Sequence, residues 1–490
     1  MSSKLRRWLV PDIALILSAI TMLYCLTSFT GMQLLFRDSD TGWHIRNGET
    51  VLATGVVPTQ ETYSYSMPGG AWYAWEWLAD CFMAQAHILD GMRGVFLLYL
   101  IVIGIVSWLW FQLVWVTKSW FLLGASATWV MLTTCNIHWL ARPHMMGWIF
   151  LLLAVLAAER VPAKLNVWWV LAVSLTSMLW ANIHGSFFLA SGIFVVYAAE
   201  KWLRKDESWK VLLSFAAISM ASSFVNPYGW HVHAHIIEYL QDKELLSRIG
   251  EFQTFNFHVE GAEALVIGML MVAAGISLNV IQGNYARAVM CLIVFAGALR
   301  SARGLPLLAL VGVPFAISAI TTFLEGIPAL KGVRQYNHNL RAMDSGFRGW
   351  LLIPVIVVLF IAAARSPLFP KGAGFPEANF PVSLTAKLEG LPPSARIFSS
   401  DKFGGFLIYQ FAGQRKVFVD GRNDYYGAEF CKNYLNFLDG KAGWEAYLNQ
   451  WKFTHALLPK DSALAEILKL KGWLELGKDP VAILLEKGPK

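Results

Sequence analysis

The chain has 490 residues, of which 56% are hydrophobic and only 15% are charged, and its mean hydropathy is +0.48. This composition excludes an ordinary soluble protein, whose surface needs a larger share of charged side chains. The net charge of +7 does not indicate nucleic-acid binding, because the Lys and Arg residues are dispersed between hydrophobic runs and form no basic stripe. With 22 Trp and 15 Tyr, the composition predicts a membrane protein with two water interfaces.

Hydrophobic runs of roughly 15 to 24 residues recur along the chain and predict about eleven transmembrane helices. The first run follows a basic N-terminus, as in a signal peptide. It is as long as a full span and lacks a small-residue cleavage site, so we interpret it as an uncleaved helix. The predicted spans lie near residues 13–35, 94–117, 119–137, 145–159, 167–183, 186–200, 211–225, 263–281, 288–300, 304–323 and 350–364.

The Lys and Arg residues between these runs predict the orientation. With a cytoplasmic N-terminus, the inner segments carry about twice as many of them as the outer segments, in agreement with the positive-inside rule. An odd number of spans then places the end of the chain outside the cytoplasm. We therefore predict a multi-pass protein of the cytoplasmic (inner) membrane with a periplasmic or extracellular C-terminal domain. Its transmembrane domain covers residues 1–365, with long outer loops at about 36–94 and 226–262.

The composition changes after residue 365, where several Pro and Gly residues mark a linker over residues 366–394. Beyond it, strand-like and helix-like patterns alternate and predict a small α/β domain over residues 395–490. Polar residues after the first two predicted strands fit turns as well as a ligand site, and we favour turns. The expected strands are residues 395–398, 416–419, 456–458, 473–476 and 482–485, and the expected helices are residues 404–411, 434–451 and 462–470.

The first outer loop begins with a dense group of ionisable residues. A helix that starts near Thr41 places Asp40 and His44 one turn apart on the same face. Paired carboxylates beside a His can hold a divalent cation, or one of them can act as a general base. Helix capping explains one acidic residue here but not the whole group. Asp38 and Asp40 are therefore candidate catalytic residues, and Asp38, Asp40 and His44 are candidate metal ligands.

Further along the same loop, residues 72–80 predict a helix that carries aromatic and acidic side chains. Its Trp residues fit a helix lying in the lipid headgroup region. Glu76 has a Trp on both sides and is less easily explained in this way, so it is a third catalytic candidate.

The other outer connections each carry a polar cluster at a helix end. Four such clusters at one membrane face suggest a shared cavity, because ionisable groups at membrane depth are costly and point to function. Arg142, Arg300 and Arg303 run against the positive-inside bias and can bind phosphate bidentately, with lipid-headgroup contact as the alternative. Glu251 is a further candidate carboxylate. The four clusters lie at residues 138–144, 180–185, 226–231 and 300–304.

Together these segments resemble the GT-C superfamily of membrane glycosyltransferases, which includes oligosaccharyltransferases, protein O-mannosyltransferases and aminoarabinose transferases. The resemblance spans most of the chain, is closest to uncharacterised bacterial members, and is more specific for the fold than for the substrate. It rests on Asp38-Ser39-Asp40 with Trp43-His44, Gly48-Glu49, Glu76-Trp77-Leu78, Ala141-Arg142-Pro143, Trp180 to Gly185, Asn226-Pro227-Tyr228-Gly229 and Phe418 to Arg422.

The resemblance implies transfer of a sugar from a polyprenyl-phosphate-linked donor to an envelope acceptor (a glycan, lipid or protein) on the outer face of the membrane. Nucleotide sugars are cytoplasmic, so transfer outside requires a lipid-carried donor. By analogy, Asp38 or Asp40 is the base, or the ligand of a divalent cation such as Mg²⁺ or Mn²⁺ that offsets charge on the leaving phosphate. The lipid phosphate would be held by Arg142, His184, Arg300 and Arg303.

The chain departs from many superfamily members in its next outer loop, residues 138–144, which contains no carboxylate. Metal dependence is therefore open, and Arg142 or a histidine can stand in for the missing ligand. The alternative to an enzyme is a non-catalytic envelope-assembly protein or a lipid-carrier flippase or transporter. The charges cluster at helix ends and not in mid-span, which favours an enzyme at the interface.

Overall fold

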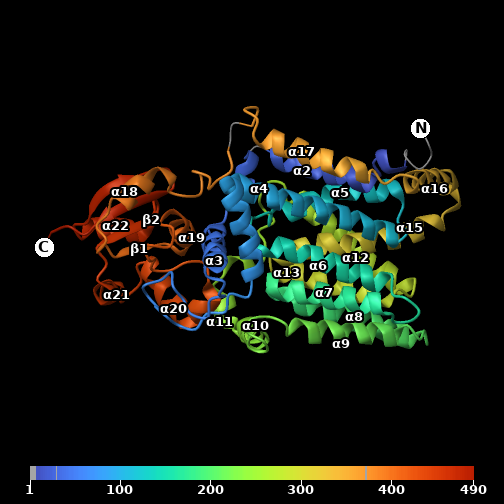
Figure 1. The fold of residues 1–490 in the computed structure, drawn as a ribbon, viewed down its shortest axis with the longest axis horizontal. Coiled ribbons are helices and arrows are strands. Elements are labelled where there is room, and N and C mark those ends of the chain that lie inside the picture. The colour runs from blue at the N-terminus through green and yellow to red at the C-terminus, as the bar shows by residue number, and fades with distance from the viewer. Residues whose placement is uncertain (1–6, 29, 370–371, 490) are drawn as a thin grey trace.

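The computed structural model describes residues 7–28, 30–369 and 372–489 and divides into a helical part and a small C-terminal sheet with its helices (Figure 1). Most helices of the helical part run along the long axis of the molecule, and the sheet lies at one end. Helix α3 (Asp40–Thr54) and the start of α4 (Trp77–Val116) lie between the two parts. Residues 36–94, which the sequence predicts to be the first outer loop, therefore lie between the helical part and the C-terminal domain.

The predicted hydrophobic runs lie on helices of the structure, because a long apolar segment satisfies its backbone internally only as a helix. These helices are α2 (Ile13–Thr27), the second half of α4, α5 (Phe121–Asn136), α6 (Pro143–Glu159), α7 (Val167–Ile183), α8 (Leu189–Leu203), α9 (Trp209–Ser223), α12 (Glu263–Ile281), α13 (Tyr285–Arg300), α14 (Gly304–Leu307) continuing through η4 (Leu308–Gly312) into α15 (Val313–Glu325), and α17 (Ile353–Ala364). The connections contain the helices α10 (His231–Gln241), α11 (Lys243–Leu246) and the more polar α16 (Lys331–Ser345).

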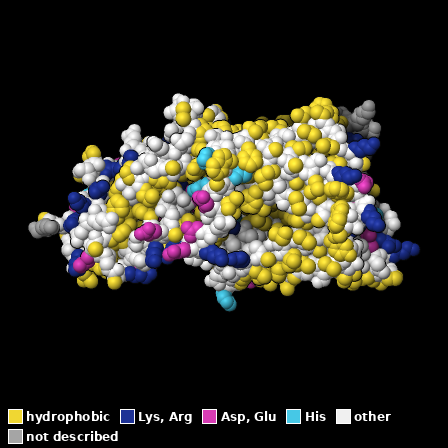
Figure 2. Space-filling view, turned by 90° about the horizontal axis from the view of Figure 1, so that it is seen from below, with side chains coloured by type: hydrophobic (Ala, Val, Ile, Leu, Met, Phe, Trp, Pro, Cys, Tyr) yellow, Lys and Arg dark blue, Asp and Glu magenta, His cyan; other side chains and the backbone are white. Residues whose placement is uncertain are grey.

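Within the described residues, five helices are long and apolar enough to cross a membrane, or six if one bent pair counts as a single span. Helices α6, α7 and α9 are apolar but shorter. Figure 2 shows hydrophobic side chains covering the side of the helical part, with Lys and Arg gathered at its far end. Trp168 is 76% exposed and Ile281 80% exposed, which fits contact with lipid. The chain is thus a helical membrane protein, and the count of about eleven spans stays a prediction.

The prediction of one continuous first span over residues 13–35 is wrong. Helix α2 ends at Thr27, and a separate 3₁₀ helix, η1 (Gly31–Phe36), follows it. Gly31 has a φ of 56°, which side-chain-bearing residues rarely adopt, so the chain turns at this residue. The turn brings Asp38 and Asp40 to the end of the helical part.

The predicted helix over residues 72–80 is wrong in its first half, because α4 begins only at Trp77. The backbone N–H of Trp72 donates to the Thr59 carbonyl over 3.0 Å, and that of Ala74 donates to the Tyr228 hydroxyl over 2.9 Å. These distant partners replace the helical hydrogen bonds. As a result the segment before α4 is irregular and lines a cavity.

The C-terminal domain contains a four-stranded sheet of order β1-β2-β4-β3. Its central strand β2 pairs in parallel with β1 and antiparallel with β4, and β3 and β4 form the predicted closing hairpin. The strands are β1 (Ile397–Ser399), β2 (His455–Pro459), β3 (Leu474–Lys478) and β4 (Ala482–Glu486), and the helices are α19 (Asp401–Gln410), α20 (Asn423–Leu438), α21 (Trp444–Trp451) and α22 (Ala463–Leu470). A further short helix, α18 (Thr385–Glu389), lies in the predicted linker and packs against this domain through Leu388.

Two predicted elements of this domain are wrong. Residues 416–419 form no strand of the sheet, because Val417 exchanges backbone hydrogen bonds of 2.9 Å with Tyr63 and Tyr65 of the first outer loop. The predicted helix over residues 434–451 is divided into α20 and α21, because Gly440 between them has a φ of 65°. The first difference matters for function, since it ties the C-terminal domain to the outer loop.

The contact between α3 and α19 depends on glycines. A Cβ atom on Gly42 would collide with the backbone carbonyl of Gly405, and one on Gly405 would collide with that of Ser39. The two backbones therefore approach more closely than any other residue permits. This contact fixes the start of α3, and with it Asp40, against the C-terminal domain.

Candidate active site

A cavity of about 400 Å³ lies where the helical part meets the C-terminal domain. Five of the predicted catalytic and phosphate-binding residues line it, namely Asp40, Glu76, Arg142, His184 and Arg303, and so does the further candidate Glu251. Its walls also contain aromatic side chains of the first outer loop and the loop that follows residue 420. The sequence predicts that four polar clusters share one cavity. Residues of three of them, 138–144, 180–185 and 300–304, line this cavity, and residues 226–231 do not.

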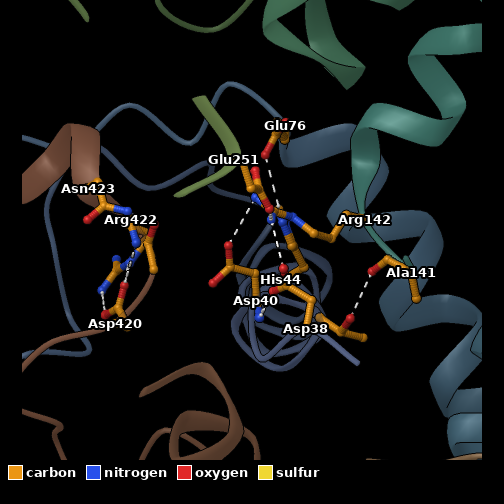
Figure 3. A network of polar contacts seen from close by, with 12 residues as sticks. Asp38, Asp40, His44, Glu76, Ala141, Arg142, Glu251, Asp420, Arg422 and Asn423 are labelled. Carbon is orange, nitrogen blue, oxygen red and sulfur yellow. Dashed lines mark hydrogen bonds and ion pairs between the residues drawn. The ribbon is translucent and has the colours of Figure 1, made fainter. Parts of the chain in front are cut away.

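The centre of the site is the guanidinium of Arg142, which faces three carboxylates (Figure 3). Its Nη1 lies 3.0 Å from Asp38 Oδ2 and 3.1 Å from Glu251 Oε1, and its Nη2 lies 3.0 Å from Asp40 Oδ2. Arg142 precedes α6, and its neighbour Ala141 is held by the hydroxyl of Thr41 over 3.0 Å. The first outer loop and the next outer connection thus meet at one partly buried ion cluster, in which Asp40 is the most buried member.

His44 does not share the environment of Asp40, although both belong to α3. Its Nδ1 lies 2.6 Å from Asp80 Oδ1, and Asn47 donates to the other oxygen of Asp80 over 2.6 Å. The His44 Nε2 atom is buried without a hydrogen-bond partner and lies 3.8 Å from Glu76. Burial, together with the charge of Arg142, holds the pKa of His44 well below its usual value, so the imidazole is neutral.

Two carboxyl groups in the cavity have raised pKa values. Burial raises the pKa of Asp40 to about 7, although the Arg142 guanidinium opposes this shift. Burial and the neighbouring Asp80 raise the pKa of Glu76 to about 8. Burial also opposes ionisation of Glu251, but Arg303 and Arg142 hold its pKa well below its usual value. Near neutral pH, Asp40 can therefore exchange a proton while Glu76 stays mostly protonated.

The predicted phosphate-binding residues differ in position. Arg303 lies at the N-terminus of α14, donates from Nε to Glu251 Oε2 over 2.6 Å, and lies 4.4 Å from the centre of the Phe252 ring. The side chain of Arg303 is 38% exposed, so its guanidinium can bind a further anion. His184 Nε2 lies 3.5 Å from Glu76 Oε1. Arg300, at the end of α13, is exposed and does not line the cavity.

Sequence reasoning missed a second ion cluster, formed by Glu61, Asp420 and Arg422, which is fully buried. Arg422 Nη2 lies 2.6 Å from Asp420 Oδ2 and 2.8 Å from Glu61 Oε1, and the side chains are at most 1% exposed. The guanidinium lies 4.7 Å from the centre of the Trp72 ring. Asp420-Gly421-Arg422 is visible in the sequence, but it fits a turn, and nothing in the sequence joins it to Glu61.

Gly421 connects the second ion cluster to the first. A Cβ atom on this residue would collide with the carboxylate of Asp40. The Asp40 carboxylate thus lies between the Arg142 guanidinium and the backbone of the C-terminal domain; Figure 3 shows Asp40 between Arg142 and the segment that carries Asp420 and Arg422. The C-terminal domain is therefore part of the wall that orients Asp40.

No protein-family model matches the chain, and no curated protein matches it in sequence. Solved structures do match. The archaeal oligosaccharyltransferase AglB from Archaeoglobus fulgidus, in complex with an inhibitory peptide and a dolichol-phosphate, has a TM-score of 0.58 at 14% identity, over 91% of this chain and 69% of that chain. The apo state of ArnT from Cupriavidus metallidurans has a TM-score of 0.50 at 13% identity, over 98% of both chains. The chain has the GT-C fold.

A third similar structure with the GT-C fold is the Archaeoglobus fulgidus oligosaccharyltransferase in complex with Zn and sulfate. Its TM-score is 0.52 at 12% identity, over 91% of this chain and 68% of that chain. The structural similarity shows the fold, whereas sequence identities this low leave the reaction to be argued from the site itself.

Proposed function

We propose that this protein transfers a sugar from a polyprenyl-phosphate-linked donor to an envelope acceptor on the outer face of the cytoplasmic membrane. The observation that carries the proposal is the cavity at one end of the membrane helices, in which buried Asp40 meets Arg142, with Glu76 and Arg303 in the same walls. In this proposal residues 1–365 are the transmembrane domain, residues 366–394 the linker, and residues 395–490 the outer-face domain that closes the cavity.

The chemistry needs a base, a place for the leaving phosphate and an oriented acceptor. Asp40 takes the proton of the acceptor while the acceptor atom attacks the anomeric carbon of the sugar. The bond from that carbon to the phosphate oxygen breaks, and the phosphate leaves with the electron pair. Arg142 holds Asp40 and Asp38 in place. Protonated Glu76 donates a hydrogen bond to the bound sugar or acceptor.

Arg303 is the best placed of the four candidates for the lipid phosphate. It is partly exposed in the cavity and lies where the continuous helical segment Gly304–Glu325 begins. The N-terminus of such a long helix carries a partial positive charge that adds to the attraction of the guanidinium for a phosphate. AglB was solved with a dolichol-phosphate, which is a polyprenyl-type phosphate of the class proposed here.

The divalent cation implied by the resemblance, Mg²⁺ or Mn²⁺, does not fit these side chains as they are arranged. Asp38, Asp40 and Glu251 all face Arg142, and His44 is turned to Asp80. Among the residues that the structure describes, no group of three or more His, Cys, Asp and Glu side chains is placed to hold an ion. No step of the proposed reaction therefore uses a cation.

Binding of a lipid phosphate tests the proposal. Purified protein should bind undecaprenyl phosphate more tightly than undecaprenol, which has the same chain without the charge, as measured by native mass spectrometry. Arg303→Met should weaken binding of the phosphate by about tenfold or more, because a charge-assisted hydrogen bond contributes roughly 1.5–3 kcal/mol. Arg300→Met is the matched control and should bind as the wild type does. Equal binding of both lipids would contradict the proposal. If the protein binds undecaprenyl phosphate but a deletion strain shows no change in its glycans, the result would favour the lipid-carrier alternative.

The pH dependence of transfer should follow the two raised pKa values. Asp40 acts as a base only when it is deprotonated, so kcat/KM should fall about tenfold per pH unit below about 7. Glu76 donates only when it is protonated, so the rate should also fall above about 8. Glu76→Gln should remove the fall at high pH and keep the fall at low pH. A rate that stays constant down to pH values near the ordinary carboxyl pKa would exclude Asp40 as the base.

A further inference from the structure

Three carboxylates and one guanidinium form the ion cluster beside the cavity. The carboxylates are arranged as they would be around a metal ion, but the guanidinium lies where the metal would be. Asp38, Asp40 and Glu251 each have an oxygen within 3.1 Å of Arg142. Without a cation between them, three carboxylates this close repel one another strongly. Arg142 therefore occupies the point at which their charges converge.

The charge of the cluster is also that of a site with a divalent cation. Arg303 is the second cation of the cluster, bound to Glu251 Oε2 over 2.6 Å on the side away from Arg142, which contacts Oε1. Two guanidinium groups carry the same total charge as one divalent ion, and they keep it at every physiological pH. The two arginines thus supply the compensating positive charge that one divalent cation would supply to the three carboxylates.

The backbone holds Arg142 in this place. The Ala141 N–H donates to the Leu35 carbonyl over 2.7 Å, and the Ala141 carbonyl accepts from the Thr41 hydroxyl over 3.0 Å. Arg142 is followed by Pro143 at the start of α6, which fixes the direction in which the helix leaves. The guanidinium is a built part of the site and not a surface side chain that happens to lie near it.

We propose that Arg142, together with Arg303, replaces the divalent cation in this protein, so that it binds a lipid phosphate without a metal ion. The inference rests on the proposed function for the identity of the phosphate. The arrangement of the charges does not depend on it. Arg142 orients the carboxylates, and Arg303 meets the phosphate.

The test compares the wild type with Arg142→Met, which removes the charge and keeps a long side chain. The wild type, treated with EDTA, should bind undecaprenyl phosphate with unchanged affinity, and titration with Mn²⁺ should show no bound ion by electron paramagnetic resonance. Arg142→Met leaves three convergent oxygen ligands, which are the ligands Mn²⁺ prefers. It should gain one Mn²⁺ per chain, and Mn²⁺ should raise its Tm but not that of the wild type.

The double variant Arg142→Met/Asp38→Asn is the control, because it removes one of the three ligands and should lose the gained ion. Arg142→Lys keeps a cation and should bind no Mn²⁺. If Arg142→Met does not fold, the wild type decides alone. One Mn²⁺ bound by the wild type, or an affinity for the lipid phosphate that falls about tenfold in EDTA (about 1.4 kcal/mol), would overturn the inference. Failure of the wild type to bind the lipid with or without EDTA would contradict the proposed function instead, while the Mn²⁺ titrations would still test the replacement.

Discussion

Asp40→Asn is expected to lower sugar transfer by about 10²- to 10⁴-fold, the usual contribution of a general base. The substitution keeps the size of the side chain but removes its ability to take a proton. It leaves Arg142 paired with Asp38 and Glu251, so the ion cluster stays compensated and the protein should still fold. The measurement is transfer to the natural acceptor, by glycan profiling of a deletion strain that expresses the variant at the wild-type level in the membrane.

Two further variants sharpen this test. Glu260→Gln replaces an exposed carboxylate of the second long outer loop and should leave transfer unchanged. Asp38→Asn should lower transfer less than Asp40→Asn, because Asp38 acts through Arg142 and does not line the cavity. Full activity in both the Asp38 and the Asp40 variant would remove the catalytic assignment of this loop.

Arg422→Met is expected to destabilise the junction between the first outer loop and the C-terminal domain by about 3–5 kcal/mol, because it leaves two buried carboxylates without a cation to compensate their charge. Both oxygens of Asp420 and one oxygen of Glu61 bind this single guanidinium. The loss should appear as a lower midpoint of chemical unfolding in detergent. It should also appear as faster proteolysis of the C-terminal domain.

The control Lys460→Met removes an exposed cation of the same domain and should change the midpoint little. The triple variant Arg422→Met/Asp420→Asn/Glu61→Gln should recover part of the stability, because it leaves no buried charge unpaired. An unfolding midpoint of Arg422→Met equal to that of the wild type would show that these charges are solvated, contrary to the structure. Transfer by Arg422→Met should fall as well, since Gly421 contacts Asp40.

The membrane helices could be predicted because their signal is local. A run of apolar residues of sufficient length forms a helix in lipid whatever its neighbours are, and the predicted runs lie on helices. The two elements that failed near the site, residues 72–76 and 416–419, obtain their hydrogen bonds from chain segments far away. Local propensity cannot predict such partners.

The candidate site divides in the same way. Composition already indicated a membrane protein. The positions of the charged residues predicted that acidic residues of the first outer loop and arginines of later connections lie at the same face. In the structure, Arg142 does contact Asp38 and Asp40. Only the tertiary structure paired His44 with Asp80 and Arg422 with Glu61, which lies 361 residues earlier in the chain. Charge and hydropathy act within short segments or across a whole face, whereas a buried ion pair requires two particular backbones to approach each other, and that approach is decided by the packing of the complete fold.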